Sequence, residues 1–239
     1  MSSDSFDVIM VDERYFREGV VGSLLGEGQM KWLEAQLLDC RSPFIILSSG
    51  TMWNDSISNG KDSWGRWDPE GRERLFAFIE ANRIAGVLLV SGDRHGARGF
   101  RIPRLSGFNF YEFEPGSLGG RSGPPIFAKD RANQLFGNAG RYAFGEFTMD
   151  ATLADPAVEF RLIGDDGTMI HEMRLTRSQL TPPAKPGTDW RPRRPIRLIK
   201  PEFGAPKDER EAEATESTES LKIQCFRRDP RGKLCCKSP

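Results

Sequence analysis

The residues best suited to chemistry in this chain are a carboxylate and an imidazole two positions apart, Asp93 and His95. They follow an apolar run at 87–90 and the dipeptide Ser91-Gly92. Asp and His together are ligands that hold divalent or trivalent metal ions over phosphate esters. An isolated Asp-x-His also occurs in polar loops, where the histidine caps a strand end or binds backbone. Both interpretations remain open on these residues alone.

Sequence patterns predict that residues 6–92 alternate between strands and helices. The run at 87–90 lacks polar alternation, which is typical of a strand buried on both faces of a parallel sheet. Asp68 followed by Pro69 predicts a helix start, with Asp as the N-cap and Pro at the first helical position. The expected order is a strand at 6–11, a helix at 28–38, a strand at 43–50, a helix from 68 and a strand at 87–90. This order predicts three parallel strands with right-handed crossovers.

Three loops should therefore leave the same edge of one sheet. The first carries Asp12 and Arg14, the second spans 48–53, and the third carries Asp93 and His95. In open α/β sheets, ligands bind beyond the carboxyl ends of the strands. Each loop is a weak signal by itself, but parallel topology brings all three together.

After residue 97 the sequence changes to the period-two alternation of half-buried antiparallel strands, seen at 99–104, 108–114, 142–148 and 158–163. Residues 164–167 predict a hairpin turn, and His171 in the returning strand is expected to be a strand residue rather than a ligand. The expected fold class is α/β to α+β, a parallel β-α-β-α-β half followed by antiparallel strands. Proline density and segregated charge then predict one domain at 1–180 and a low-complexity, disordered tail at 181–239.

Composition excludes several classes of partner and location. Lys plus Arg and Asp plus Glu each number 34, so net charge gives no case for nucleic acid or an anionic membrane as a partner. No apolar run approaches about 18 residues, which predicts no membrane segment. The N-terminus shows no signal peptide, so the localisation is left open, cytoplasmic for the sequence as it stands. The four cysteines have no C-x-x-C spacing, which favours a reducing compartment and disfavours cysteine-bound zinc.

Four sequence blocks occur in a fixed order along the chain. They are Val-Asp-Glu-Arg-Tyr-Phe-Arg at 11–17, Leu-Gly-Glu-Gly-Gln-Met-Lys-Trp-Leu at 25–33, Asp-Ser-Trp at 62–64 and Ser-Gly-Asp-Arg-His at 91–95. Together they resemble the PhoD-like phosphatases, the alkaline phosphatase D group of metallophosphoesterases. The likeness covers roughly residues 6–180, and several ordered blocks are more specific than one short motif.

The resemblance implies a fold like the C-terminal half of a metallophosphoesterase αββα sandwich. It implies a metal-dependent phosphoester hydrolase, a phosphatase or phosphodiesterase, with divalent or trivalent metal ions (Ca, Fe, Mn or Zn) as cofactors and a phosphoester as substrate. Asp93, His95 and Asp12 are the implied metal ligands. His95 and Arg14 are the implied catalytic residues, and Arg14 would bind the substrate phosphate through its planar fork. An internal salt bridge is the alternative role for Arg14.

The early metal-binding blocks of metallophosphoesterases have no counterpart in this sequence. No Gly-Asn-His occurs, and no Gly-Asp precedes residue 92. Three interpretations follow: an incomplete phosphohydrolase that needs a separate N-terminal half of the catalytic domain, a non-catalytic binding module, or a truncated fragment that retains the scaffold. On the first interpretation, hydrolysis by the isolated chain should be undetectable or very slow, because a two-metal centre draws on several more ligands.

Overall fold

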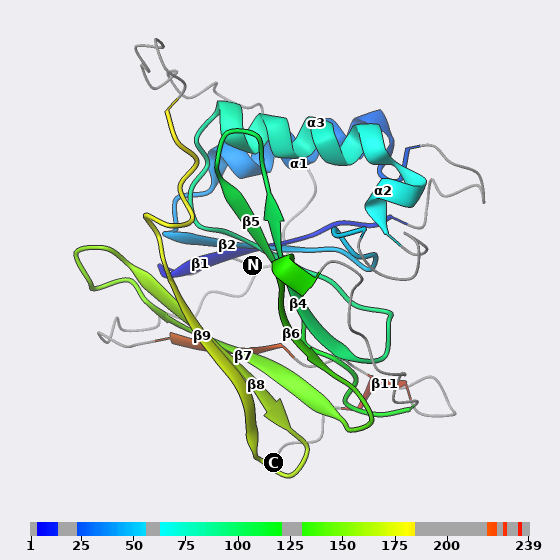
Figure 1. Cartoon of the computed structure of the whole chain (residues 1–239). Helices are drawn as coiled ribbons and strands as arrows, with labels where there is room; N and C mark the ends of the chain where they lie inside the picture. Colours follow the sequence, from blue (N-terminus) through cyan, green and yellow to red (C-terminus); the bar gives the residue numbers. More distant parts are fainter. Residues whose placement is uncertain are drawn as a thin grey trace, which may run out of the picture. The chain divides into compact units, whose positions relative to one another are not determined.

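The computed structural model describes residues 4–13, 23–55, 63–120 and 131–184, and the backbone of 219–223, 227–228 and 234–235. Residue contacts divide the chain into two units, one of Met1–Pro183 with Thr218–Pro239 and one of Ala184–Ser217. The elements of the first unit are shown in Figure 1. In chain order they are β1 (Phe6–Met10), α1 (Gly26–Asp39), β2 (Phe44–Ser48), α2 (Trp64–Trp67), α3 (Pro69–Ala81), β3 (Val87–Val90), β4 (Ala97–Pro103), β5 (Asn109–Glu114), the 3₁₀ turn η2 (Arg131–Asn133), β6 (Gln134–Asn138), β7 (Ala143–Asp150), β8 (Ala157–Gly164), β9 (Met169–Thr176), β10 (Glu219–Ile223), β11 (Arg227–Arg228) and β12 (Leu234–Cys235).

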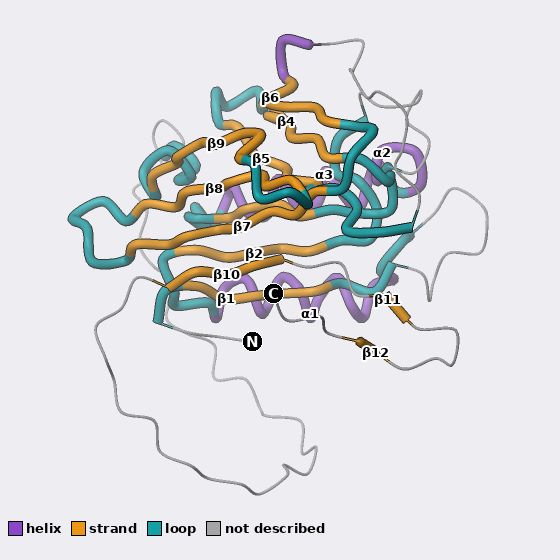
Figure 2. Tube along the Cα trace, turned by 90° about the horizontal axis from the view of Figure 1, so that it is seen from below, coloured by secondary structure: helices purple, strands orange, loops and turns teal. Residues whose placement is uncertain are grey.

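A six-stranded sheet of order β1-β2-β3-β5-β4-β6 forms the centre of the fold. β1, β2, β3 and β5 run parallel, whereas β4 pairs antiparallel with both β5 and β6. β1 and β2 lie side by side, and α1 lies behind β1 in the view of Figure 2. The predicted β-α-β-α-β arrangement is confirmed. β6 was not predicted, because its short segment has no clear alternation.

α1 and α3 cover one face of this sheet (Figure 1). Their buried positions recur at helical spacing, so each helix turns a single apolar side towards the strands. Asp68 caps α3, since its carboxylate accepts the N–H of Gly71 at 2.8 Å, and it also accepts the N–H of Leu24 at 2.9 Å. Among the described helices, none is both long and apolar enough to cross a membrane. The buried helical side chains are Met30, Leu33 and Leu37 in α1, and Leu75, Phe76 and Ile79 in α3.

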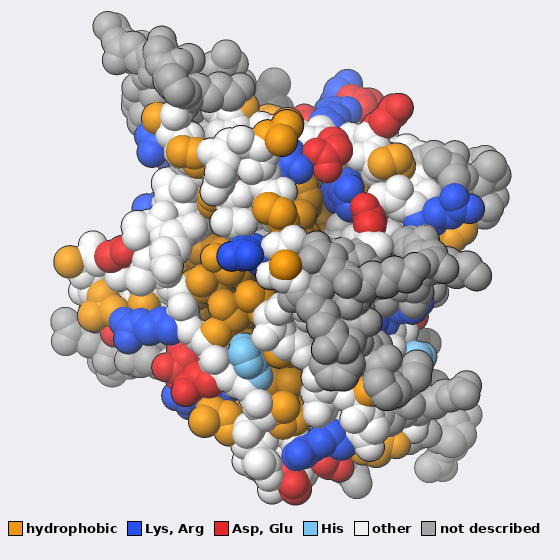
Figure 3. Space-filling view, viewed as in Figure 1, with side chains coloured by type: hydrophobic (Ala, Val, Ile, Leu, Met, Phe, Trp, Pro, Cys, Tyr) orange, Lys and Arg blue, Asp and Glu red, His pale blue; other side chains and the backbone are white. Residues whose placement is uncertain are grey.

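The other face of the six-stranded sheet packs against a four-stranded antiparallel sheet of order β10-β7-β8-β9. The ring of Phe113 in β5 lies 5.2 Å from Phe147 in β7 and 4.6 Å from Phe160 in β8, measured between centroids. Figure 3 shows hydrophobic side chains gathered at the seam between the two sheets. The layers are therefore helices, a mainly parallel sheet and an antiparallel sheet, which confirms the predicted fold class.

β8 and β9 form the hairpin predicted at Gly164–Gly167. His171 lies in β9, as expected, and its ring centroid is 4.8 Å from that of Phe136 in β6. Burial lowers the pKa of His171 below its usual value. This histidine is therefore part of the packing between the sheets.

The segment expected to be disordered contains three short strands, β10, β11 and β12, and the longest of them, β10, joins the antiparallel sheet. β10 pairs antiparallel with β7 along its whole length. Without β10, β7 would be an edge strand with unpaired backbone groups, which attract a further strand. Composition does not reveal such long-range pairing. Residues 185–218, which hold the basic and acidic blocks of the predicted tail, lie outside the described residues.

Candidate active site

Loops that follow β1, β2 and β3 lie at one edge of the six-stranded sheet. Backbone hydrogen bonds continue there past the strand ends: the N–H of Val11 donates to the carbonyl of Ser48 at 3.1 Å, and the N–H of Ser49 donates to the carbonyl of Val90 at 2.9 Å. The residue after β3 bonds in the same way to the end of β5. The carboxyl ends of four parallel strands therefore share one edge, as the sequence pattern predicts for the first three.

Asp93 and His95 lie in the short loop between β3 and β4, and both are exposed. Their φ angles are +75° and +60°, so both adopt the left-handed backbone region. That region costs a non-glycine residue about 1–2 kcal/mol. Such conformations persist only where the surrounding structure holds them, and they cluster at functional sites. Among the described residues of the three loops, positive φ at a non-glycine residue occurs in this loop only.

Two buried side chains hold the centre of this loop from below. The N–H of Arg94 donates to Oε1 of Glu114 at 2.8 Å, and Nη2 of Arg98 donates to the carbonyl of Arg94 at 3.2 Å. Arg98 and Glu114 also form an ion pair, with Nε 2.9 Å from Oε2. Burial raises the pKa of Glu114 to about 8, against the opposing effect of the nearby guanidinium.

Glu112, two residues earlier in β5, links two of the loops. It is fully buried and accepts the N–H groups of Trp53 at 2.8 Å and Asn54 at 2.9 Å, from the loop after β2. It also accepts the hydroxyl of Ser91 at 2.6 Å, from the loop after β3. Burial raises the pKa of Glu112 to about 7. One carboxylate thus fixes the distance between these two loops.

The first loop is held by a side chain of α1. Asp12 is exposed, but its backbone N–H donates to Oε1 of Gln29 at 2.8 Å, and Nε2 of Gln29 donates to its carbonyl at 2.7 Å. The glutamine of the block at 25–33 therefore orients the residue that the resemblance assigns as a ligand. Arg14 lies outside the described residues, so its predicted roles in catalysis and substrate binding remain predictions.

Glu13, next to Asp12, points inward instead. Its carboxylate accepts the hydroxyl of Ser49, which in turn accepts the indole N–H of Trp64 at 2.8 Å. Burial raises the pKa of Glu13 above its usual value, and the hydrogen bonds oppose that shift. The ring of Trp64 stacks on Trp53 with centroids 4.8 Å apart. These contacts tie the loops after β1 and β2 to the start of the second helical segment.

The donor chemistry of Asp12, Asp93 and His95 fits a divalent or trivalent metal ion, because carboxylate oxygens and imidazole nitrogens are common ligands of such ions. The number of donor side chains is too small to complete a metal site. Within the described part of the chain, no group of three or more His, Cys, Asp or Glu side chains could hold an ion. β2 separates β1 from β3, so their ends lie about 10 Å apart at two interstrand spacings. By themselves these three residues do not complete a metal site.

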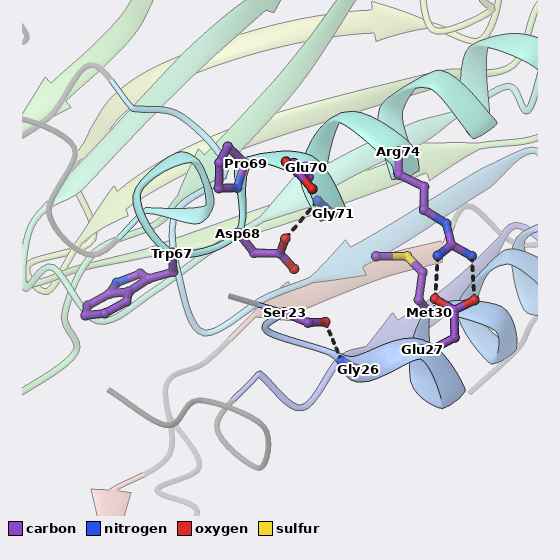
Figure 4. Close-up of a pocket in the computed structure, with 10 residues that line it drawn as sticks. All are labelled: Ser23, Gly26, Glu27, Met30, Trp67, Asp68, Pro69, Glu70, Gly71 and Arg74. Atoms are coloured by element: carbon purple, nitrogen blue, oxygen red, sulfur yellow. Dashed lines mark hydrogen bonds and ion pairs between the residues drawn. The ribbon is translucent and has the colours of Figure 1, made fainter. Parts of the chain in front are cut away.

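A cavity of about 570 Å³ opens where α1 and α3 begin (Figure 4). The Arg74 guanidinium on its wall pairs with Glu27 at 2.7 Å and with Glu34 at 2.8 Å. This cation is already neutralised by two carboxylates, so it leaves little charge to bind an anion. None of the three implied metal ligands lines this cavity. It is therefore separate from the candidate site.

Sequence analysis did not predict the buried polar side chains of this edge, which are Glu13, Arg98, Glu112 and Glu114. The sequence pattern does contain a signal for two of them, Glu112 and Glu114. The alternation that places Phe110 of β5, and Phe108 just before it, on one face also places Glu112 and Glu114 on that face. A carboxylate on the apolar face of a strand indicates a buried charge with specific partners.

Comparison with known proteins identifies one family. A family model described as PhoD-like phosphatase matches residues 4–155. A solved structure of PhoD is 19% identical, with a TM-score of 0.49, and the match covers 70% of this chain and 42% of that chain. The structure of GAP50, described as the anchor in the inner membrane complex of Plasmodium, is 14% identical, with a TM-score of 0.44 and coverage of 72% and 49%. This chain thus spans less than half the length of either protein. No curated protein matches the sequence significantly.

Proposed function

Because this chain belongs to the PhoD-like phosphatase family, we propose that it takes part in metal-dependent hydrolysis of phosphoesters. The observation that carries the proposal is the left-handed loop with Asp93 and His95, directly after a parallel strand. Ligands of open α/β sheets bind at this edge. Strained backbone at the same place is typical of a functional site.

The proposed roles follow the chemistry of each side chain. Asp93 and His95 bind a metal ion, and Asp12 from the loop after β1 is the third candidate ligand. Arg14 binds a nonbridging oxygen of the substrate phosphate through its planar guanidinium, and His95 and Arg14 together form the catalytic pair. When bound, a divalent or trivalent ion would neutralise charge on the phosphoryl group.

We further propose that this site is incomplete in the chain by itself. Two or three donors are too few for a two-metal centre, which draws carboxylates and imidazoles from several loops. Residues such as Gln29 and Glu114 orient backbone but cannot replace missing ligands. A separate polypeptide with the missing Gly-Asp and Asn-His blocks, equivalent to the N-terminal half of the catalytic domain, is the proposed partner.

Hydrolysis of p-nitrophenyl phosphate and bis-p-nitrophenyl phosphate, with Mn²⁺, Zn²⁺, Ca²⁺ or Fe³⁺ added, tests this function. We expect an undetectable or very slow rate for the chain alone and a higher rate with the proposed partner. Any rate above background should fall at least about tenfold in Asp93→Ala and His95→Ala, because each removes a ligand. Asp165→Ala, an exposed carboxylate in the β8–β9 turn, is the matched control and should keep the rate.

Different outcomes separate the alternatives. Turnover that survives Asp93→Ala contradicts the assigned site. Full turnover of the isolated chain that Asp93→Ala abolishes contradicts only the proposed incompleteness. No turnover under any condition, from a chain that unfolds in one cooperative transition, favours a non-catalytic binding module. The lack of such a transition favours a truncated fragment.

A further inference from the structure

We propose that the buried ion pair of Arg98 and Glu114 is a positioning device for the loop that carries Asp93 and His95. The use of this loop in metal binding rests on the proposed function. The geometry of the ion pair is independent of the proposed function, because it follows from contacts within the described residues. Neither side chain is proposed to touch substrate or metal.

The pair holds both peptide groups at the centre of the loop. The N–H that donates to Glu114 belongs to the peptide between Asp93 and Arg94. The carbonyl that accepts from Arg98 belongs to the peptide between Arg94 and His95. With both peptide planes fixed, the Cα atoms of Asp93 and His95 have little freedom to turn. Their left-handed φ angles are the two unfavourable conformations that need such support.

The pair is anchored in the sheet and not in the loop itself. Arg98 in β4 lies directly opposite Glu114 in β5, in the antiparallel register of these strands. Their side chains are 0% and 2% exposed. Glu112, on the same face of β5, holds the beginning of the loop through the hydroxyl of Ser91. The loop is therefore fixed at its start and centre by carboxylates from one rigid strand.

Stability alone is a poor explanation for this pair. Taking two charges out of water is costly, and an apolar pair of similar volume is often as stable or more so. Nη1 of Arg98 is also buried without a hydrogen-bond partner, so the site does not recover the full desolvation cost of the guanidinium. What an apolar pair cannot supply is an acceptor for the Arg94 N–H together with a donor to its carbonyl. The geometry points to loop position as the contribution of the pair.

The test compares two charge-free variants of the full chain. Arg98→Met with Glu114→Met removes the pair and the acceptor for the Arg94 N–H. Arg98→Met with Glu114→Gln is the matched control, because the amide oxygen still accepts that N–H. Both variants avoid an unpaired buried charge, which would itself destabilise the fold.

Amide hydrogen exchange at Arg94, measured by NMR, is the main readout. The reference is the Ile45 amide, which donates to the Gly86 carbonyl at 2.9 Å within the sheet. We expect exchange at Arg94 to rise at least about tenfold more than at Ile45 in the Met/Met variant, and to stay near the wild-type rate in the Met/Gln variant. Mn²⁺ affinity should fall at least about tenfold in the Met/Met variant and by less in the Met/Gln variant, which keeps the acceptor for the Arg94 N–H but loses the donor to its carbonyl.

Unchanged exchange at Arg94 in the Met/Met variant overturns the inference. An equal rise at Arg94 and Ile45 also overturns it, because the pair would then stabilise the sheet as a whole. If wild-type protein binds no Mn²⁺ even with the proposed partner present, the proposed function fails, while the two exchange measurements still decide whether the pair positions the loop.

Discussion

Among individual side chains, the carboxylates of the candidate site divide into two groups. Asp12 and Asp93 are exposed to solvent. Glu112 and Glu114 are buried and accept hydrogen bonds from loop backbone. The exposed aspartates are therefore suited to ligand binding. The buried glutamates fix the position of loops at the same edge of the sheet.

The buried Glu112 predicts how stability should depend on pH. Burial raises its pKa to about 7 in the folded chain, compared with about 4.3 for an unfolded glutamate. Between these values the folded chain keeps a proton that the unfolded chain has lost. The free energy of unfolding should therefore fall as pH rises through this window, by up to a few kcal/mol from this residue.

Urea unfolding of wild type and Glu112→Gln at several pH values measures this effect. We expect the fall in free energy of unfolding between about pH 5 and pH 8 to be smaller in the variant. Glu114 remains in both proteins, but Glu112 contributes to its raised pKa, so the Glu114 contribution also shrinks in the variant. Glu70→Gln, an exposed glutamate at the start of α3, should behave like wild type. Equal pH dependence in wild type and Glu112→Gln would refute the raised pKa.

The helices that cover the sheet also organise the loops at its edge. α1 supplies Gln29, which holds Asp12. Asp68 is the N-cap of α3, which begins at the next residue. Its carboxylate accepts the N–H of Gly71 in the first turn of α3 and the N–H of Leu24 just before α1. The beginnings of both helices lie at the carboxyl edge of the parallel strands, because each helix follows a strand that ends there. Side chains at the starts of the two helices are therefore hydrogen-bonded to the loop that carries Asp12 and to Leu24 just before α1.

Asp68→Ala tests this connection. The substitution removes the acceptor for two backbone N–H groups, those of Gly71 and Leu24. We expect the free energy of unfolding to fall by about 1–3 kcal/mol, from the lost cap and the buried donor left unpaired. Glu70→Ala, in the same first turn but exposed, should cost less than about 1 kcal/mol. Equal destabilisation by the two substitutions in urea unfolding would show that Asp68 has no such role.

For the chain as a whole, local sequence patterns predicted the parallel half and the loop with Asp93 and His95. Apolar runs, helix caps and strand order are local signals, and parallel topology determines which strand ends meet. The pairing of β10 with β7 was missed because it joins residues about 70 positions apart and depends on an open sheet edge. Arg98 was missed because burial of a charge depends on tertiary packing, whereas the alternation along β5 did carry a signal for Glu114.

The central claim is that Asp93 and His95 form a metal-binding loop at the shared edge of the parallel strands. Mn²⁺ added to the intact chain tests it most directly, through paramagnetic broadening of backbone amide signals. We predict selective broadening at 11–13 and 91–96, lost in Asp93→Ala, and little effect at the Gly164–Gly167 turn, which carries two exposed carboxylates of its own. Broadening centred on that turn, or unchanged by Asp93→Ala, would contradict the claim.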